Sequence, residues 1–222
     1  CPVATGAAAA IVTTDKSLIS KADKAVKIEA VTMGSAMYGD NSYHLITTTG
    51  TNASAVIDGF VVRGGNANAG GNNDKGAGIL CLGAVSPTVR NCFFRDNRCT
   101  FGGAAGYVNN GGAPTFTDCT FEDGNGGSFG GAFDIAGGGA VKFERCLFRG
   151  NTAARGGALE IFATNGVIVN NCVFRENAAT AQGGGALWLG SGSNTQIRNC
   201  TVVANTATGT AVAGILHQNG FA

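Results

Sequence analysis

One eight-residue phrase, RNCFFRDN at residues 90–97, returns four more times along the chain. Its later forms are TDCTFEDG, ERCLFRGN, NNCVFREN and RNCTVVAN. Each form carries one cysteine, at spacings of 27, 27, 26 and 28 residues: Cys92, Cys119, Cys146, Cys172 and Cys200. Phrases of the GGAL type and of the SPTVRNC type accompany it in fixed order. Phrases that repeat in fixed order at one period indicate a repeat architecture, in which each unit stacks on its neighbours.

The repeat unit is typical of short strands joined by turns. Each phrase alternates β-branched or aromatic residues with polar residues and ends at Gly or Asn. No window of about 10–12 residues in the repeats has helical amphipathicity, which disfavours leucine-rich and helical solenoids. Three strands in about 27 residues therefore predict an all-β fold, a right-handed parallel β-helix in which each strand stacks on its equivalent one coil later.

Stacking turns each equivalent position into a ladder of like side chains. We expect the cysteine column to point inward, reduced and buried, and the aromatic column two residues later to do the same: Phe94, Phe121, Phe148 and Phe174, with Val202 last. The preceding strand supplies a further inward column: Val89, Phe116, Phe143, Val169 and Ile197. We expect left-handed corners and an amide ladder from one set of asparagines, with Gly124 in the second coil: Asn97, Asn151, Asn177 and Asn205.

The repeats divide the chain into two parts. Residues 1–25 do not match them and are predicted to form a short helix that caps the coil or, alternatively, reaches a neighbouring molecule. Residues 26–222 are predicted to form the β-helix, irregular over 26–75, with a loop at 64–75, and regular over 76–222. Asp58 and Gly59 are expected where later coils have Asn and Cys. Cys81 and Cys99 lie outside the cysteine column and could pair with each other, whereas Cys1 is alone.

The composition argues against several partners. Charged residues make up 13% of the chain, against about 25% in a typical protein, and the net charge is +1. We therefore expect no nucleic-acid partner, and no apolar run approaches the roughly 20 residues of a transmembrane segment. A surface this poor in charge is weakly protected against self-association.

Two motifs resemble those of known families. The combination of GGA[ILV] with F-x-x-N, as in FRDN 94–97, FRGN 148–151 and FREN 174–177, resembles the repeat of chlamydial-type polymorphic outer-membrane proteins. The phrases AVIDGFVVRGGNA and SPTVRNC resemble bacterial secreted right-handed parallel β-helix repeat proteins. The resemblance covers about residues 56–218 and implies an extracellular or bacterial cell-surface location with an adhesive or structural role. Residues 1–24 match neither family.

The outward columns contain the candidate site residues. The column after GGA is predicted to run through Leu80, Gly106, Asp134, Glu160, Trp188 and Leu216. Asp134 and Glu160 would then stand about 5 Å apart at the backbone, beside Trp188. Three interpretations remain open: two solvated acids, a weak sugar or cation site, or a catalytic pair. A second column is expected to form ion pairs: Arg95, Glu122, Arg149, Arg175 and Val203.

The sequence thus favours one function and leaves a second open. The leading hypothesis is a non-enzymatic structural or adhesive β-helix that binds a cell-surface or matrix partner, or associates with itself end to end. The alternative is a carbohydrate-active module that binds or cleaves polysaccharide at Asp134, Glu160 and Trp188. We predict no cofactor and no metal site, since His44 and His217 fall at opposite ends of the repeats.

Overall fold

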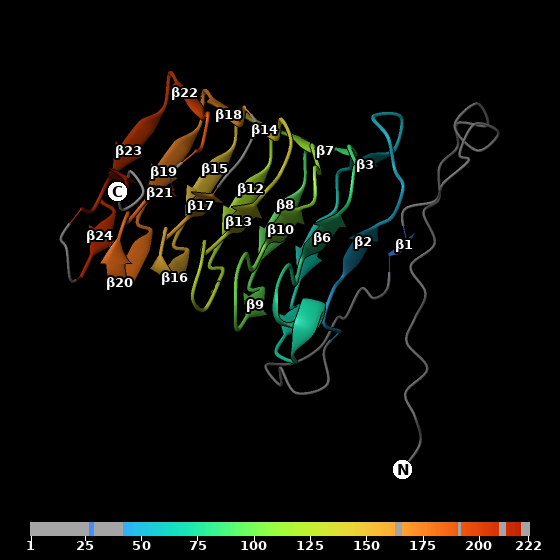
Figure 1. Ribbon diagram of the computed structural model, residues 1–222, viewed down its shortest axis with the longest axis horizontal. Helices are drawn as coiled ribbons and strands as arrows, with labels where there is room; N and C mark the ends of the chain where they lie inside the picture. Colours follow the sequence, from blue (N-terminus) through green and yellow to red (C-terminus); the bar gives the residue numbers. More distant parts are fainter. Residues whose placement is uncertain (1–26, 29–41, 163–165, 191, 209–211, 219–222) are drawn as a thin grey trace, which may run out of the picture.

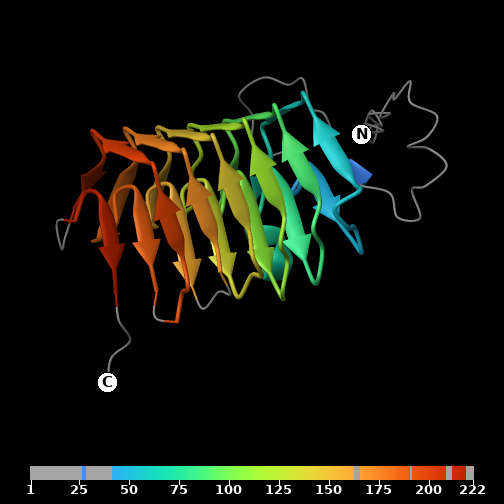
Figure 2. The same cartoon turned by 90° about the horizontal axis from the view of Figure 1, so that it is seen from above.

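The computed structural model describes residues 27–28, 42–162, 166–190, 192–208 and 212–218. In these residues the chain winds into a right-handed parallel β-helix whose coils stack along the long axis of the molecule (Figure 1). Equivalent strands of successive coils lie side by side when the molecule is seen from above (Figure 2). The predicted fold class is confirmed. The described residues contain a short 3-10 helix, Gly71–Asp74, and no helix long and apolar enough to cross a membrane.

Sheet A is the longest of the stacked sheets. Its strands pair in parallel, except that the first pairs antiparallel with the second. The strands are β1 (Lys27–Ile28), β2 (Ile46–Thr48), β6 (Ile79–Leu82), β10 (Gly106–Asn109), β13 (Phe133–Ala136), β17 (Leu159–Phe162), β21 (Leu187–Leu189) and β25 (Ile215–His217).

Sheets B and C complete each coil, and both are parallel throughout. Sheet B consists of β3 (Val56–Asp58), β7 (Thr88–Arg90), β11 (Thr115–Thr117), β14 (Lys142–Glu144), β18 (Ile168–Asn170) and β22 (Gln196–Arg198). Sheet C consists of β4 (Val61–Arg63), β8 (Phe93–Arg95), β12 (Thr120–Glu122), β15 (Leu147–Arg149), β19 (Val173–Arg175) and β23 (Thr201–Val203).

A fourth segment follows sheet C in each coil and stacks on its own equivalents. Its strands form two small parallel sheets: β5 (Asn66–Ala67) with β9 (Arg98–Cys99), and β16 (Thr152–Arg155), β20 (Ala178–Gly183) and β24 (Thr206–Ala207). The region 64–75, predicted to be a loop, therefore contains a short strand and the 3-10 helix.

A single left-handed residue turns the chain from sheet B to sheet C. It directly precedes each cysteine of the column and has a φ of 52° or 53°: Asn91, Asp118, Arg145, Asn171 and Asn199. Asn and Asp adopt this conformation more readily than other side chains do. In the first coil Gly59, with φ 77°, takes this place, because Asp58 pairs with Arg90. The expected alignment of Asp58 and Gly59 with Asn and Cys was therefore wrong by one residue.

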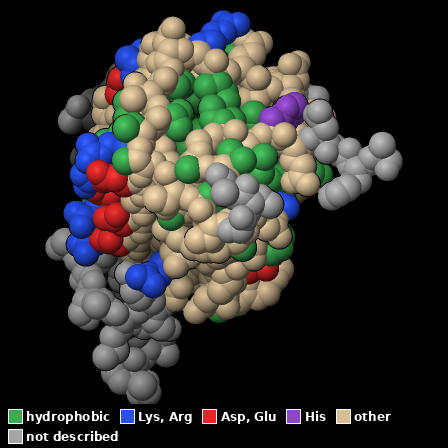
Figure 3. All heavy atoms as spheres, turned by 90° about the vertical axis from the view of Figure 1, so that its left-hand side faces the viewer, with side chains coloured by type: hydrophobic (Ala, Val, Ile, Leu, Met, Phe, Trp, Pro, Cys, Tyr) green, Lys and Arg blue, Asp and Glu red, His purple; other side chains and the backbone are tan. Residues whose placement is uncertain are grey.

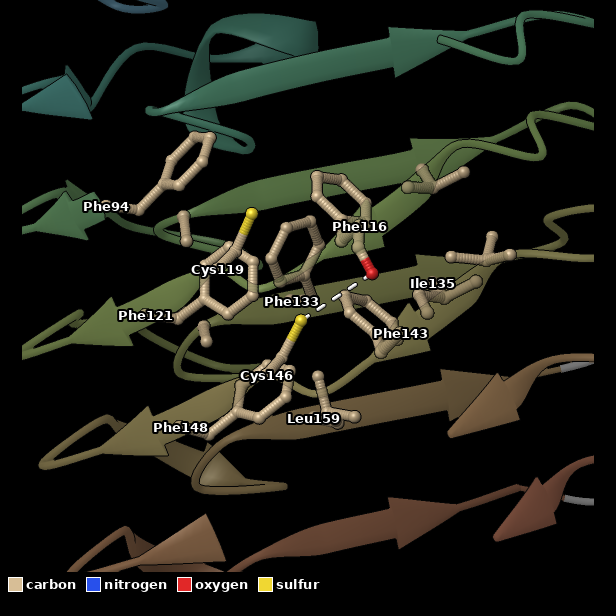
Figure 4. Packing of buried hydrophobic residues seen from close by; sticks show 14 of the residues in the cluster. Phe94, Phe116, Cys119, Phe121, Phe133, Ile135, Phe143, Cys146, Phe148 and Leu159 are labelled. Atoms are coloured by element: carbon tan, nitrogen blue, oxygen red, sulfur yellow. Dashed lines mark hydrogen bonds between the residues drawn. The ribbon is translucent and has the colours of Figure 1, made fainter. Parts of the chain in front are cut away.

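The core is a stack of aromatic rings along the inside of the coil (Figure 4). The centroid of the Phe148 ring lies 4.9 Å from that of Phe121 and 4.6 Å from that of Phe174. Phe116 and Phe143 stack at 5.1 Å, and Phe133 packs edge-on against both. All these rings are fully buried, and burial of each contributes about 1.5–3 kcal/mol. The predicted inward columns are confirmed, except that Ile197, Cys200 and Val202 in the last coil are only partly buried.

Three of the four predicted asparagines form the amide ladder, whereas Asn97 bonds the backbone of Val62 and Gly65 instead, and the left-handed conformation lies one residue earlier than expected. The Asn151 side chain donates to Oδ1 of Asn177 at 3.0 Å, and the Asn177 side chain donates to Oδ1 of Asn205 at 2.9 Å. The residues with positive φ are those directly before: Asp96, Asp123, Gly150, Glu176 and Ala204. The prediction for Gly124 was therefore wrong. Gly124 is required because a Cβ there would lie 2.7 Å from the Gly131 carbonyl oxygen.

Two further predictions concern the cysteines outside the column and the N-terminal cap. Cys81 and Cys99 do not pair with each other, because Cys81 belongs to the main core and Cys99 to a small separate core with Ala67, Ala77 and Ala104. The cap predicted for residues 1–25, and Cys1 with it, lie outside the described residues.

Candidate functional site

The outward column of sheet A carries the predicted acidic pair. Asp134 pairs in register with Glu160, and Glu160 with Trp188, as the sequence predicted. The predicted member Gly106 was wrong, because Tyr107 stands between Leu80 and Asp134. The error arose from the GG pair at Gly102, which sits one residue earlier relative to the strand than the later GG pairs do. We call Leu80, Tyr107, Asp134, Glu160 and Trp188 the floor column.

The floor column is buried rather than exposed. Asp134, Glu160 and Trp188 are 2%, 3% and 4% exposed. The fourth segments of the coils cover them, since four of their residues form a parallel column of bridges: Lys75, Gly102, Phe129 and Arg155. We call these residues the roof. Of the three interpretations, the one with two solvated acids was therefore wrong.

Arg155 connects the roof to the floor. Its Nε donates to Oε1 of Glu160 at 3.0 Å. Its guanidinium carbon lies 4.1 Å from the Trp188 ring centroid and 4.5 Å from that of Phe129. Lys75 plays a similar part, with its ammonium 4.5 Å from the Phe101 ring and 5.2 Å from the Tyr107 ring. Both roof cations thus lie over aromatic faces, and each pairs with a carboxylate, Arg155 with Glu160 and Lys75 with Asp74 at 3.2 Å, so cation–π contacts add to charge pairing.

Burial dominates the protonation of the acidic pair. Burial raises the pKa of Asp134 well above its usual value, the nearby Glu160 raises it further, and Arg155 and Lys75 act in the opposite direction. Burial also raises the pKa of Glu160, although its hydrogen bonds with Arg155 lower it in part. Tyr107 has its pKa raised to about 12 by burial and then by Asp134. Asp134 and Tyr107 therefore favour their neutral forms, and Glu160 is held in a pair with Arg155. These contacts join the roof to sheet A.

Sequence reasoning missed the roof. Lys75, Phe129 and Arg155 were not singled out, although Arg155 stands five residues before Glu160 and the same offset separates Phe129 from Asp134. That repeated offset was the available signal. Within the described residues, Oε2 of Glu160 and Nε1 of Trp188 are buried without a hydrogen-bond partner. A ligand could reach these atoms only if the roof moved.

A second outward column lies on sheet C; its arginines are exposed or partly exposed, whereas Glu122 is buried. Its register is the predicted one, and Arg63 extends it by one coil before Arg95: Arg95, Glu122, Arg149, Arg175 and Val203. Glu122 pairs with Arg149, whereas Asp96 accepts from both Arg63, at 2.8 Å, and Arg95, at 3.1 Å. The expected ladder of ion pairs therefore exists in part: Glu122 and Arg149 pair within the column, whereas Arg63 and Arg95 pair with Asp96 in the turn that follows the strand.

An apolar column runs beside these arginines on the same face of sheet C. Its members alternate with the buried residues of the sheet: Val61, Phe93, Thr120, Leu147, Val173 and Thr201. Val61 is 58% exposed, and Phe93, Leu147 and Val173 are partly exposed. The guanidinium carbon of Arg95 lies 5.6 Å from the Phe93 ring centroid. Sheet C thus presents an apolar strip next to a cationic one.

The two histidines do not form a site. His44 is buried, with its ring 3.2 Å from the Gly76 carbonyl oxygen and 3.3 Å from Oδ1 of Asn73, and His217 ends β25. In the part of the chain that the structure describes, no three His, Cys, Asp or Glu side chains gather to hold a metal ion.

Comparison with known proteins identifies the fold family alone. The family model described as "Right handed beta helix region" matches residues 77–221. No curated protein and no solved structure matches the chain.

Proposed function

Because the chain belongs to the family of right-handed β-helix proteins, we propose that it is a non-enzymatic structural or adhesive protein that binds its partner through sheet C. The observation that carries this proposal is the pair of parallel outward columns on that sheet. An extracellular or bacterial cell-surface location belongs to the same proposal and is supported by the resemblance of the GGA[ILV] and F-x-x-N motifs.

The sheet C face has the composition of a protein-binding surface. Interfaces are enriched in aromatic residues and arginine, and large apolar strips on a surface mark interaction sites. The face offers Phe93, Leu147 and Val173 in one line and Arg95, Arg149 and Arg175 in the next. Adjacent strands stand about 4.8 Å apart, so Leu147 and Val173 are neighbours, whereas Thr120 separates Phe93 from Leu147 and Glu122 separates Arg95 from Arg149.

Replacing the apolar strip tests the adhesive role. The variant Phe93→Ser/Leu147→Ser/Val173→Ser is compared with Val56→Ser/Ile168→Ser on the outer face of sheet B. Binding is measured on wells coated with fibronectin, collagen or polygalacturonate, with folding monitored by circular dichroism. The proposal predicts at least a tenfold loss for the sheet C variant alone. Equal binding by both variants and the wild-type protein would refute it.

End-to-end self-association is a second form of the same role. Strands β22, β23, β24 and β25 are the last described in their sheets, and Val203 and Ile215 are 51% and 39% exposed there. A hollow of about 230 Å³ opens between them, lined by Val202, Val203, Ala204, Asn205, Ala213 and Gly214. Figure 3 views this end and shows apolar side chains gathered in its middle. Paired strand edges and apolar contacts would join two copies.

Light scattering and electron microscopy test this form. Val203→Lys/Ile215→Lys places two charges at the end of the coil, and Val61→Lys places one on the side. Assembly that is lost only in the end variant supports end-to-end association. Assembly that survives in the end variant excludes it.

A further inference from the structure

The five cysteines of the column form a continuous line of free thiols inside the coil. None of them is in a disulfide: Cys92, Cys119, Cys146, Cys172 and Cys200. Each corresponds to the cysteine of the next coil, because the strands on both sides are paired in register. Neither the floor column nor sheet C involves these residues, so neither the roof nor the proposed function explains them. We call this line the cysteine ladder.

The thiols of the ladder share one orientation. In four coils Sγ lies 3.6 Å from a carbonyl oxygen of the preceding coil, that of Val89, Phe116, Phe143 or Val169. Figure 4 shows this bond for Cys146, with the sulfur of Cys119 pointing in the same direction one coil away. Within its own coil each Sγ also lies 3.1–3.4 Å from the carbonyl oxygen two residues earlier.

The spacing of the ladder matches one coordination geometry. Parallel strands stack about 4.8 Å apart, and equivalent side chains in the same rotamer keep that spacing. A metal–thiolate bond is about 2.3 Å long, so a linear sulfur–metal–sulfur unit spans roughly 4.6 Å. Three or more donors do not converge on one point in the described residues, so two-coordinate binding is the geometry that the ladder offers. Soft thiolate ligands suit Cu(I), Zn and iron–sulfur clusters, and because zinc and the clusters need four ligands, a pair of thiolates favours Cu(I).

We propose that neighbouring thiols of the cysteine ladder bind soft monovalent metal ions of the Cu(I) class, with one ion held between two thiolates. For each ion, two S–H bonds break, two metal–sulfur bonds form and two protons leave to solvent, with no change of oxidation state. The product carries one negative charge in the interior. One backbone N–H stabilises it between Cys146 and Cys172, since the Cys146 amide donates to Sγ of Cys172 at 3.4 Å.

The end of the ladder at Cys200 is its most accessible part. Cys200 is the one member that is not fully buried, so an ion enters the ladder most easily between Cys172 and Cys200.

Pairwise binding predicts which cysteines change the number of bound ions. Five thiols in a line hold two ions in separate neighbouring pairs. Removing Cys119 or Cys172 isolates one thiol at an end and leaves room for one ion. Removing Cys146 leaves two complete pairs, and removing Cys92 or Cys200 leaves four thiols in a row, so these variants still hold two ions.

The test counts Ag(I), a redox-stable probe of this class, by native mass spectrometry. The parent variant is Cys1→Ser/Cys81→Ala/Cys99→Ala, which keeps the ladder as the source of thiols. In this background Cys119→Ala and Cys172→Ala should each bind one ion, and Cys146→Ala and Cys92→Ala should each bind two. Titration in weak buffer should release two protons per ion.

Three results would overturn the proposal. These are no uptake of Ag(I) by the folded parent, equal counts in Cys119→Ala and Cys146→Ala, and release of one proton per ion. Circular dichroism of each metal-free variant checks that it is folded. If Cys146→Ala does not fold, the comparison of Cys119→Ala and Cys172→Ala with Cys92→Ala carries the same contrast.

Discussion

Asn177 is the corner residue whose loss should be most costly, because it holds two coils together. It is fully buried. Its side-chain nitrogen donates to the Phe148 carbonyl oxygen at 3.0 Å and to Oδ1 of Asn205 at 2.9 Å. Its own Oδ1 accepts from the backbone and the side chain of Asn151, both at 3.0 Å. The substitution Asn177→Ala removes all four bonds.

The cost follows from the groups left without a partner. The Phe148 carbonyl, the Asn151 backbone N–H and one N–H of the Asn151 side chain lose a bond and stay buried. Each such group costs about 1–3 kcal/mol, and partial relaxation of the corner reduces the sum, so we expect a loss of about 3–5 kcal/mol. Asn205→Ala is the matched control. Asn205 is only partly buried, so water replaces lost bonds there and the loss should be about 1–2 kcal/mol.

Urea unfolding measures this difference. The chain has one tryptophan, Trp188, whose fluorescence reports on the neighbouring coils, and circular dichroism reports on the whole solenoid. Agreement of the two probes checks that unfolding is two-state, which repeat proteins do not always satisfy. If Asn177→Ala lost less than about 1 kcal/mol, or no more than Asn205→Ala, the amide ladder would not be the stabilising element described above.

Three further predictions concern the floor column and the core. Burial raises the pKa of Asp134 above that of the unfolded chain, so its contribution to stability is full below about pH 4 and is lost as pH rises through the folded pKa. The free energy of unfolding of Asp134→Asn in urea should therefore rise relative to that of the wild type as pH increases above about 4, by at most about 1.4 kcal/mol per pH unit, and a difference independent of pH would contradict this. Gly102→Ala should lower the melting temperature, because a Cβ there collides with the Asp134 carboxylate. In a protein that already carries Asp134→Ala, Gly102→Ala should cause much less of this loss. Equal losses in the wild type and in Asp134→Ala would show that the contact is unimportant. Phe148→Ala should cost about 3–5 kcal/mol in urea unfolding, against less than half of that for Val202→Ala at the partly buried end of the same column, and similar costs would argue against a continuous ring stack.

The repeats predicted the fold because equivalent positions in several coils support the same assignment of strands. A column of five equivalent cysteines fixes the strand register more strongly than any single pattern, and the inward phenylalanines follow from alternation along the strand. The two errors of alignment, at Gly59 and at Gly106, both fell where a glycine changed the apparent position of a motif. Glycine serves in this chain both for left-handed turns and for close contact with a neighbouring coil. The sequence alone does not show which of these two roles a given glycine has.

The burial of the acidic pair could not be predicted from alternation. Alternation places Asp134 and Glu160 outside the coil, and it carries no information about a segment that folds back over the sheet. Apart from Arg155, which ends β16, the roof residues lie outside the strands, and their stacking becomes visible only when the bridges from Lys75 through Gly102 and Phe129 to Arg155 are known. Those bridges convert a candidate open site into a buried, charge-paired layer.

The most direct test of this account compares two sets of substitutions in one binding assay. Phe93→Ser/Leu147→Ser/Val173→Ser alters sheet C, and Asp134→Asn/Glu160→Gln alters the floor column without changing its shape. Binding to the same coated wells, polygalacturonate included, is measured for both variants and for the wild-type protein. The account predicts that the sheet C variant loses binding and that the floor variant keeps it. Loss in the floor variant with full binding by the sheet C variant would contradict the account and favour a carbohydrate site beneath the roof.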